Sequence, residues 1–399
     1  MPATPVLTDR WVDALRAAVR AELPAAISLR HELHSYPDLS GSEEATAELV
    51  RRALGPVEVT SVAGTGMLAR IGRADGPVVA VRAELDALPV TELTEVSWSA
   101  SGPCMHACGH DVHMAALIAL CRGASRVELP VAMLAVFQPR EEAYPSGALD
   151  IVSSPEWKAH EVRAVVGAHV QPLLAPGTVA ATPGAINAAV CNVEITVTGS
   201  GGHAAYPHVT QDPVLAISEI VVSLQQAVSR RISPLHVAVL SIGELRAGTA
   251  PGVIPTSAQA TGTLRVLDPA DMQTLRDAVA EITQAVARAH RCEASVSFEV
   301  GEPVLVNDER LALETRELLT RFGVPLAPDL RSCGADDFSY YAQAHPGLMM
   351  FVGTRNIGQG EAVSLHQPTF CPSDDAIADV ADALLAGIAS AAALETPHS

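Results

Sequence analysis

The chain has few aromatic residues, few positive charges and no long uninterrupted apolar run. Aromatic residues make up 4% of its 399 positions, so a core must be built mainly from Ala, Val, Leu and Ile. Lys and Arg number 26 against 45 Asp and Glu, and the formal net charge of -19 would repel a phosphate backbone or an anionic membrane. We therefore expect neither a nucleic-acid partner nor a membrane partner.

Cysteine is too scarce and too irregularly spaced for a disulfide framework. The seven cysteines are an odd set in a long chain, which favours reduced thiols. The N-terminus, MPATPVLTDRWVDALRAAVRAEL, has early acidic residues and no apolar stretch of the signal-peptide type. No later run approaches the length of a membrane span, so we expect a cytoplasmic protein.

Apolar runs and helical periodicity alternate along both ends of the chain. Apolar residues recur every three or four positions from Trp11 to about Ser35, which predicts an amphipathic helix. Short apolar runs predict buried strands at 77–82, 131–137, 162–170 and 348–352, and helical patterns cover 110–127, 307–323 and 373–392. This alternation is typical of an α/β sheet with helices on its faces.

The middle of the chain follows another order. Its patterns predict a strand at 193–198, a helix at 210–231, strands at 236–246 and 257–266, a helix at 270–290 and a strand at 293–300. A β-α-β-β-α-β order is typical of a ferredoxin-like α+β sandwich. We therefore predict two domains: a catalytic domain made of 1–184 and 301–399, and an inserted lid made of 185–300.

The densest group of chemically active side chains is 102–113, GPCMHACGHDVH, with two cysteines, three histidines and an aspartate. Cys108 and His110 are two positions apart, so a loop can aim both at one point while Gly109 allows close approach. Asp111 could either bind a metal or orient a ligand. The alternative is a helix N-terminus capped by Asp111 with incidental histidines. A zinc finger is excluded because no second Cys/His pair follows at finger spacing.

A carboxylate pair, Glu141-Glu142, follows the apolar run VAMLAVFQP. Active sites of open α/β sheets lie where parallel strands enter their loops. Adjacent residues there tend to face different ways, so one carboxylate can bind metal while the other addresses a water. Taken alone, such a pair is more often a solvated surface feature.

Two isolated histidines complete a possible ligand set. His169 ends a strand-like run and His366 follows another; singly, each is more often a hydrogen-bonded core histidine than a ligand. With Cys108, His110 and one Glu they supply five ligands, as two metal ions sharing a bridging water or carboxylate would need.

A glycine-rich stretch at 198–202 leads to His203. A phosphate-binding loop is a weak interpretation because no Lys follows and the next helix begins too late. The glycines instead allow His203 to project from the lid and donate to an oxyanion.

Several motifs in a fixed order carry a resemblance to a known family. They include RHELH at 30–34, RAELDALP at 82–89, MHACGHDVH at 105–113, GAHV at 167–170, GGHAA at 201–205 and GTLR at 262–265. Over nearly the whole chain, the sequence resembles amidohydrolases of the M20 metallopeptidase type, which include hippurate hydrolases, auxin-conjugate hydrolases and aminoacylases.

The resemblance implies a fold and a metal centre. The fold is an αβα catalytic domain of the zinc-exopeptidase type with a ferredoxin-like lid that can pair two subunits into a homodimer. The metal centre is two divalent ions per subunit, zinc or manganese with cobalt and nickel as alternatives. The ions would be held by five residues: Cys108, His110, Glu142, His169 and His366.

The implied activity is hydrolysis of the amide bond of N-acyl amino acids. Glu141 is then the general base, His203 the oxyanion donor, and Asp86 a supporting carboxylate that orients ligands or the bridging water. Arg265 and His208 are the candidate substrate-binding residues. The chain departs from the family pattern at three positions: Glu84 and Asp336, where Asp and Glu are usual, and Gly252, where Asn is usual.

Two other functions remain open. A dipeptidase or carboxypeptidase would share the metal chemistry and differ in substrate. A non-catalytic metal or thiol sensor would use Cys104 and Cys108, but it gives no reason for Glu141 beside Glu142.

Overall fold

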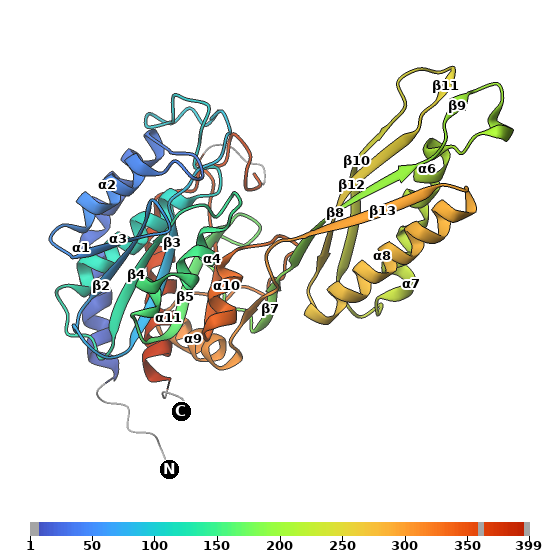
Figure 1. Cartoon of the computed structure of the whole chain (residues 1–399). Helices are drawn as coiled ribbons and strands as arrows, with labels where there is room; N and C mark the ends of the chain where they lie inside the picture. Colours follow the sequence, from blue (N-terminus) through green and yellow to red (C-terminus); the bar gives the residue numbers. More distant parts are fainter. Residues whose placement is uncertain (1–7, 358–362, 395–399) are drawn as a thin grey trace, which may run out of the picture. The chain divides into compact units, whose positions relative to one another are not determined.

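The computed structural model describes residues 8–357 and 363–394, which fall into two compact units (Figure 1). The first unit comprises Met1–Gly184, Val306–Leu330 and Asp337–Ser399, and the second comprises Ala185–Leu305 and Arg331–Asp336. The second unit is thus inserted between segments of the first.

A seven-stranded sheet forms the centre of the first unit, in the order β1-β2-β4-β3-β5-β15-β6. The four central strands, β4, β3, β5 and β15, run parallel, whereas β1, β2 and β6 pair antiparallel with their neighbours at the edges. The strands span Val59–Val62 (β1), Gly66–Ile71 (β2), Val78–Glu84 (β3), Ala132–Gln138 (β4), Val162–Gln171 (β5), Val179–Ala180 (β6) and Gly347–Gly353 (β15).

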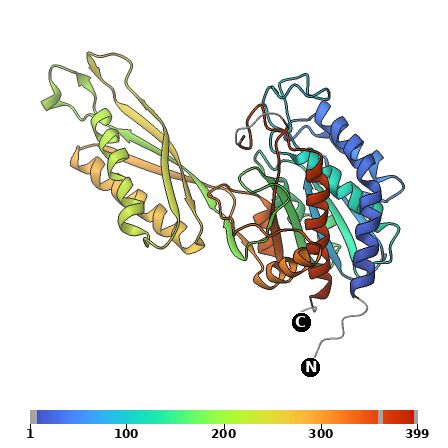
Figure 2. The same ribbon diagram turned by 180° about the vertical axis from the view of Figure 1, so that it is seen from behind.

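Helices cover both faces of this sheet (Figures 1 and 2). A Cβ atom on Gly387 would lie 2.6 Å from Val166, and one on Gly167 would lie 2.9 Å from Phe338, so successive residues of β5 face different helices. One face carries α1 (Thr8–Ser35), α2 (Glu44–Leu54), α3 (His110–Ala124), α9 (Glu309–Arg321) and α11 (Asp375–Ala393), and the other carries α4 (Gly147–Ser153), α5 (Pro155–Lys158) and α10 (Phe338–Ala344). The predicted αβα catalytic fold is confirmed.

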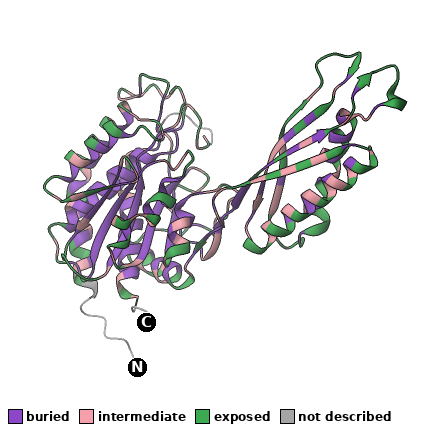
Figure 3. Cartoon of the chain, viewed as in Figure 1, coloured by how far each residue is buried: buried purple, intermediate pink, exposed green. Residues whose placement is uncertain are grey.

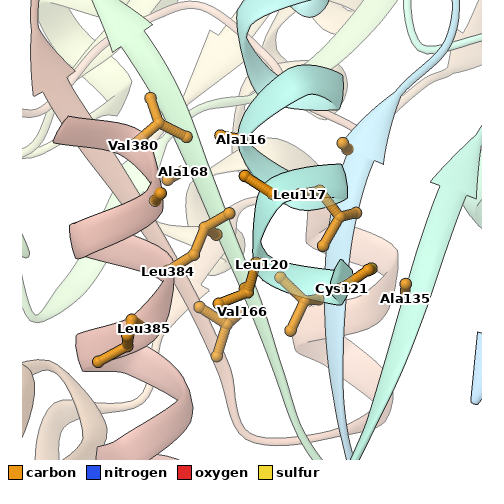
Figure 4. Close-up of a cluster of buried hydrophobic side chains, with 14 of the residues drawn as sticks. Ala116, Leu117, Leu120, Cys121, Ala135, Val166, Ala168, Val380, Leu384 and Leu385 are labelled. Atoms are coloured by element: carbon orange, nitrogen blue, oxygen red, sulfur yellow. The ribbon is translucent and has the colours of Figure 1, made fainter. Parts of the chain in front are cut away.

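Aliphatic side chains fill the core, as the scarcity of aromatic residues requires. Leu117 and Leu120 of α3 pack with Val166 of β5 and Leu384 of α11 (Figure 4). Every residue of β3, β4 and β15 is buried, which explains why their sequences are mainly apolar (Figure 3).

Helix α11 corrects one expectation. Its length and composition would allow it to cross a membrane, whereas the sequence was expected to hold no such run. Within the structure 78% of this stretch is buried, and it packs against β5, α3 and α9. The helix is mainly apolar because these neighbours enclose most of its surface.

The second unit has a four-stranded antiparallel sheet in the order β10-β12-β8-β13. Along the chain these are the second, third, first and fourth strands, which is the ferredoxin-like arrangement and confirms the predicted lid fold. Val193, Ile195 and Val197 point into its core, while the residues between them are exposed or half-buried. The elements are β8 (Ala189–Thr198), α6 (Pro213–Ser223), α7 (Gln225–Arg231), β10 (Ala238–Ala247), β12 (Ser257–Val266), α8 (Pro269–Ala289) and β13 (Glu293–Val300).

The second unit is larger than the predicted insertion, 185–300. It continues to Leu305 and takes in Arg331–Asp336, because Ser332 N donates to Ile186 O and Ala188 N donates to Gly334 O. The remaining short elements are β7 (Gly184–Asn187), β9 (Gly202–His203), a 3-10 helix at Pro207–Val209, β11 (Val253–Ile254) and β14 (Leu305–Asn307).

Candidate metal centre

The carboxyl ends of three neighbouring parallel strands bring the predicted acids and one histidine together. Asp86 follows β3, Glu141 and Glu142 follow β4, and His169 lies near the end of β5. Since these ends share one edge of the sheet, residues far apart in the chain become neighbours.

The Cys108-Gly109-His110 turn brings two further candidates to this edge. Gly109 has φ 84°, and a Cβ atom there would lie 2.5 Å from Val170 Cγ2, so only glycine fits. The close approach leaves Cys108 Sγ 3.4 Å from His169 Nε2, and His110 begins α3. The role expected of the glycine is therefore observed.

Hydrogen bonds orient both imidazole rings. His110 Nδ1 donates to Asp86 O at 2.8 Å, and His169 Nδ1 donates to Val170 O at 2.7 Å. In each neutral ring the proton therefore lies on Nδ1, and Nε2 keeps its lone pair. Buried rings held in this way are suited to binding a metal through Nε2.

The carboxylate pair and His366 lie at the same cluster. Glu142 N donates to Asp86 Oδ2 at 2.9 Å, and Glu141 Oε2 lies 3.9 Å from His110 Nε2. His366 Nε2 lies 3.2 Å from Glu142 Oε1, and its backbone N donates to Ala107 O at 2.8 Å. The side chain of His366 is 51% exposed, whereas the other members of the cluster are nearly enclosed.

The donor set fits a metal ion. Cys108, His110 and Glu142 each offer one ligand atom, and these atoms lie within 4.8 Å of one another. His110 Nε2 and Glu142 Oε1 are buried and make no hydrogen bond. Buried polar atoms without partners are rare, and sulfur, nitrogen and oxygen donors together suit zinc and similar ions.

Charges in the cluster also favour a cation. Burial lowers the pKa of His110, but the charges of Glu84, Asp86 and Glu142 outweigh it and raise this pKa to about 10. Burial, reinforced by Glu142 and Glu141, raises the pKa of the Cys108 thiol well above its usual range. Without a cation, both groups are therefore protonated at neutral pH.

Metal affinity is accordingly expected to rise with pH. A bound ion needs the Cys108 thiolate and neutral His110, so binding releases about two protons at pH 6–8. Titration with metal and a competing chelator at several pH values measures this dependence. A dissociation constant independent of pH across this range would contradict the ligand assignment.

Asp111, whose role the sequence left open, pairs with two side chains of α1 and is not part of the ligand cluster. Its Oδ2 accepts from Arg30 Nε at 2.9 Å and from His34 Nδ1 at 3.0 Å. It does not cap the helix either, since Gly109 occupies the N-cap of α3. The RHELH motif of α1 thus fixes the residue next to His110.

Sequence reasoning assigned no role to His113 or Arg82, which the structure places beside the cluster. His113 Nδ1 donates to Glu84 Oε2 at 2.9 Å, and the buried Arg82 pairs with Glu84 and Asp337. Two features of the sequence could have pointed to these residues: the third histidine of MHACGHDVH, and the departure from the family pattern at Glu84.

The remaining candidates belong to the second unit. His203 lies in β9, where its Nδ1 accepts from Ala205 N at 3.0 Å, and His208 lies in the exposed 3-10 helix. Arg265, on β12, donates from Nη1 to Cys333 O at 2.9 Å. Gly252 precedes β11, and its carbonyl accepts from Ala204 N.

Comparisons with known proteins agree on one family. Residues 80–390 match the sequence profile of peptidase family M20/M25/M40. N-acetylcysteine deacetylase of Bacillus subtilis is 34% identical over 359 residues, which cover 88% of this chain and 92% of the relative. IAA-amino acid hydrolase ILR1-like 5 of Arabidopsis thaliana is 33% identical over 389 residues, which cover 94% and 88%.

A solved structure supports the same relationship. A protein of Bacillus subtilis described as a dinuclear metal-binding peptidase from the M20 family superposes with a TM-score of 0.79 and 31% identity, covering 93% of this chain and 98% of that one. The resemblance inferred from the motifs is confirmed, and the chain belongs to peptidase family M20/M25/M40.

Proposed function

We propose that the chain is a metal-dependent amidohydrolase that cleaves N-acyl amino acids into a carboxylic acid and a free amino acid. The observation that carries this proposal is the buried cluster at the strand ends, where ligand atoms without hydrogen-bond partners lie beside a second carboxylate. The names of the deacetylase and amino acid hydrolase relatives support the substrate class.

Two divalent ions would be held by the five predicted ligands: Cys108, His110, Glu142, His169 and His366. Zinc and manganese are the first candidates, with cobalt and nickel as alternatives, because the donors mix sulfur, nitrogen and oxygen. When bound, such ions polarise a substrate carbonyl and lower the pKa of a nearby water molecule.

Glu141 acts as the general base in this proposal. Its backbone follows the same strand as Glu142, and its side chain is only 11% exposed near His110. The carboxylate accepts a proton from the attacking water and returns it to the leaving amine. Asp86 supports this step by holding the backbone N of Glu142 and the ring of His110 in place.

His203 supplies a hydrogen bond to the oxyanion. Because its Nδ1 accepts from Ala205 N, the neutral ring carries its proton on Nε2, which is then the donor. Arg265 and His208 are proposed to bind the polar end of the substrate. One guanidinium nitrogen of Arg265 is engaged by Cys333 O, which fixes the direction of the others.

Replacing His203 with Ala is expected to lower kcat by about 10²–10³, the usual cost of one oxyanion donor. The exposed ring lies outside the metal cluster, so metal content and thermal stability should stay unchanged. Steady-state kinetics with metal analysis measure both. His208→Ala is the matched control and is expected to raise KM more than it lowers kcat. An unchanged kcat in the His203 variant would remove the residue from the reaction.

The thiol-sensor function is disfavoured by the cysteines themselves. Burial, with the charge of Asp38, raises the pKa of Cys104 to about 11, and the pKa of Cys108 is also raised. Thiols that stay protonated react slowly with oxidants. A thiol sensor would need a cysteine whose pKa is lowered instead.

Amine release tests the proposal directly. N-acetyl, N-benzoyl and indole-acetyl amino acids would be assayed beside dipeptides, with metal-stripped and metal-restored protein. Hydrolysis of the acyl amino acids that returns with metal is the expected result. Faster cleavage of dipeptides would make the chain a dipeptidase, and no hydrolysis of any amide would refute the proposal.

The partner expected besides the substrate is a second copy of the chain, paired through the lid domain. Within the described residues, the edge strands β10 and β13 of the four-stranded sheet each pair with one neighbour of that sheet and leave one side open. A cytoplasmic location remains the expectation, supported by seven free cysteines.

A further inference from the structure

Both ring nitrogens of His113 are engaged in hydrogen bonds within the protein, although the residue lies among the proposed metal ligands. His113 is one turn beyond His110 on α3 and is 1% exposed. Its Nδ1 donates to Glu84 Oε2 at 2.9 Å, while its Nε2 accepts from Val170 N at 3.0 Å. Glu84, His110, His113 and His169 offer ligand atoms within 4.8 Å of one another, yet His113 has no lone pair left for a metal.

The backbone of Val170 is held on both sides by histidines. Its N–H donates to His113, and its carbonyl accepts the Nδ1 proton of His169 at 2.7 Å. The two rings meet edge to face, with centroids 4.7 Å apart. A shift of His113 would therefore move Val170 and turn Nε2 of His169.

Glu84 is in turn fixed by a buried cation. Arg82 is fully buried and donates to Glu84 Oε1, to Gln138 Oε1 at 3.0 Å and to Asp337 Oδ1 at 2.9 Å. Asp337 also accepts from Gln138 Nε2 and from Ser146 Oγ. The carboxylate of Glu84 therefore has little freedom to move.

We infer that Glu84 and His113 are positioning residues that aim His169 at one of the two metal ions. A continuous series of hydrogen bonds runs from Arg82 through Glu84 and His113 to the backbone of Val170 and then to His169. The inference rests on the proposed function, because it takes His169 as a ligand. It also gives the departure at Glu84 a role, since its carboxylate is the group that accepts the His113 proton.

Metal titration of the full-length protein tests the inference without relying on activity. His113→Phe keeps an aromatic ring and removes both hydrogen bonds. Loss of such a support is expected to raise the dissociation constant of one ion about 10–100-fold and to leave the other ion closer to wild type. Activity should fall at limiting metal and recover largely in excess metal, which a general loss of folding would not produce.

Asp382→Asn is the matched control. Like Glu84, Asp382 is a carboxylate of the first unit that pairs with arginine, but it lies away from the proposed metal ligands. Asp382 accepts from Arg16 and Arg20 and contacts none of the proposed ligands. This variant is expected to lose stability and to keep the wild-type dissociation constants of both metal ions. Equal weakening of metal binding in both variants would overturn the inference, as would wild-type constants in His113→Phe.

Glu84→Asp keeps the test decisive if His113→Phe does not fold. This variant retains the charge opposite Arg82 but shortens the side chain by one methylene. The dissociation constant of the ion affected in His113→Phe should therefore rise here too, by a smaller factor. Unchanged constants in this variant would overturn the inference. Wild-type protein that binds no metal would instead refute the proposed function, so the two failures are distinguishable.

Discussion

Replacing Glu141 with Gln is expected to lower kcat by about 10²–10⁴ while two metal ions remain bound. The amide keeps the size and polarity of the side chain but cannot accept a proton from the attacking water. Since Glu141 is not one of the five proposed ligands, the ions should keep their affinity. Amine release under saturating substrate measures kcat, and elemental analysis of the same sample measures metal content.

Glu142→Gln provides the contrast. Its Oε1 is buried, makes no hydrogen bond and lies 3.2 Å from the ring of His366, another proposed ligand, so this change should weaken metal binding as well as activity. The two adjacent substitutions thus separate proton transfer from metal binding. Near-normal turnover in the Glu141 variant would remove that residue from its role, and equal metal loss in both would assign both carboxylates to the ligands.

Replacing Arg30 with Met is expected to lower the free energy of unfolding by about 3–5 kcal/mol, the usual cost of removing one partner of a buried ion pair. The fully buried guanidinium donates to Asp111 and Asp374 and to Pro372 O, and it lies over the ring of Trp98. Without it, the charge of Asp111 stays buried with His34 alone to balance it. Urea denaturation followed by circular dichroism measures the loss.

Arg16→Met on the same helix is the control. Its side chain is 23% exposed and shares Asp382 with Arg20, so its loss should cost about 1 kcal/mol or less. If both variants lose the same stability, the buried pair contributes nothing beyond an ordinary surface contact.

The fold class could be predicted because local patterns and element order agree. The mainly apolar runs of β3 to β5 indicated strands buried on both faces, and the β-α-β-β-α-β order of the middle segment indicated a ferredoxin-like sheet. The segment Arg331–Asp336 could not be assigned to the inserted unit in the same way. It joins through backbone hydrogen bonds to residues about 145 positions away, which no local pattern encodes.

The site was predicted in part. Cys108 and His110 stand out because ligand-type residues are concentrated in 102–113, and the carboxylate pair stands out because it follows the end of a strand. The functions of Asp111 and His113 depend on partners 81 and 29 positions away, Arg30 and Glu84, and on which ring nitrogen carries the proton. Residue type alone could not distinguish His113 from a metal ligand, whereas its two hydrogen bonds leave neither ring nitrogen free.

The place of β15 in the central sheet bears on how the protein is made. This strand lies between β5 and β6, yet the ribosome produces it about 165 residues after them, once the whole inserted unit has emerged. The main segment of the second unit is continuous in sequence and can collapse as soon as it leaves the exit tunnel. The central sheet of the first unit must wait, with the place between β5 and β6 unfilled, until the inserted unit and the segment up to β15 have been translated.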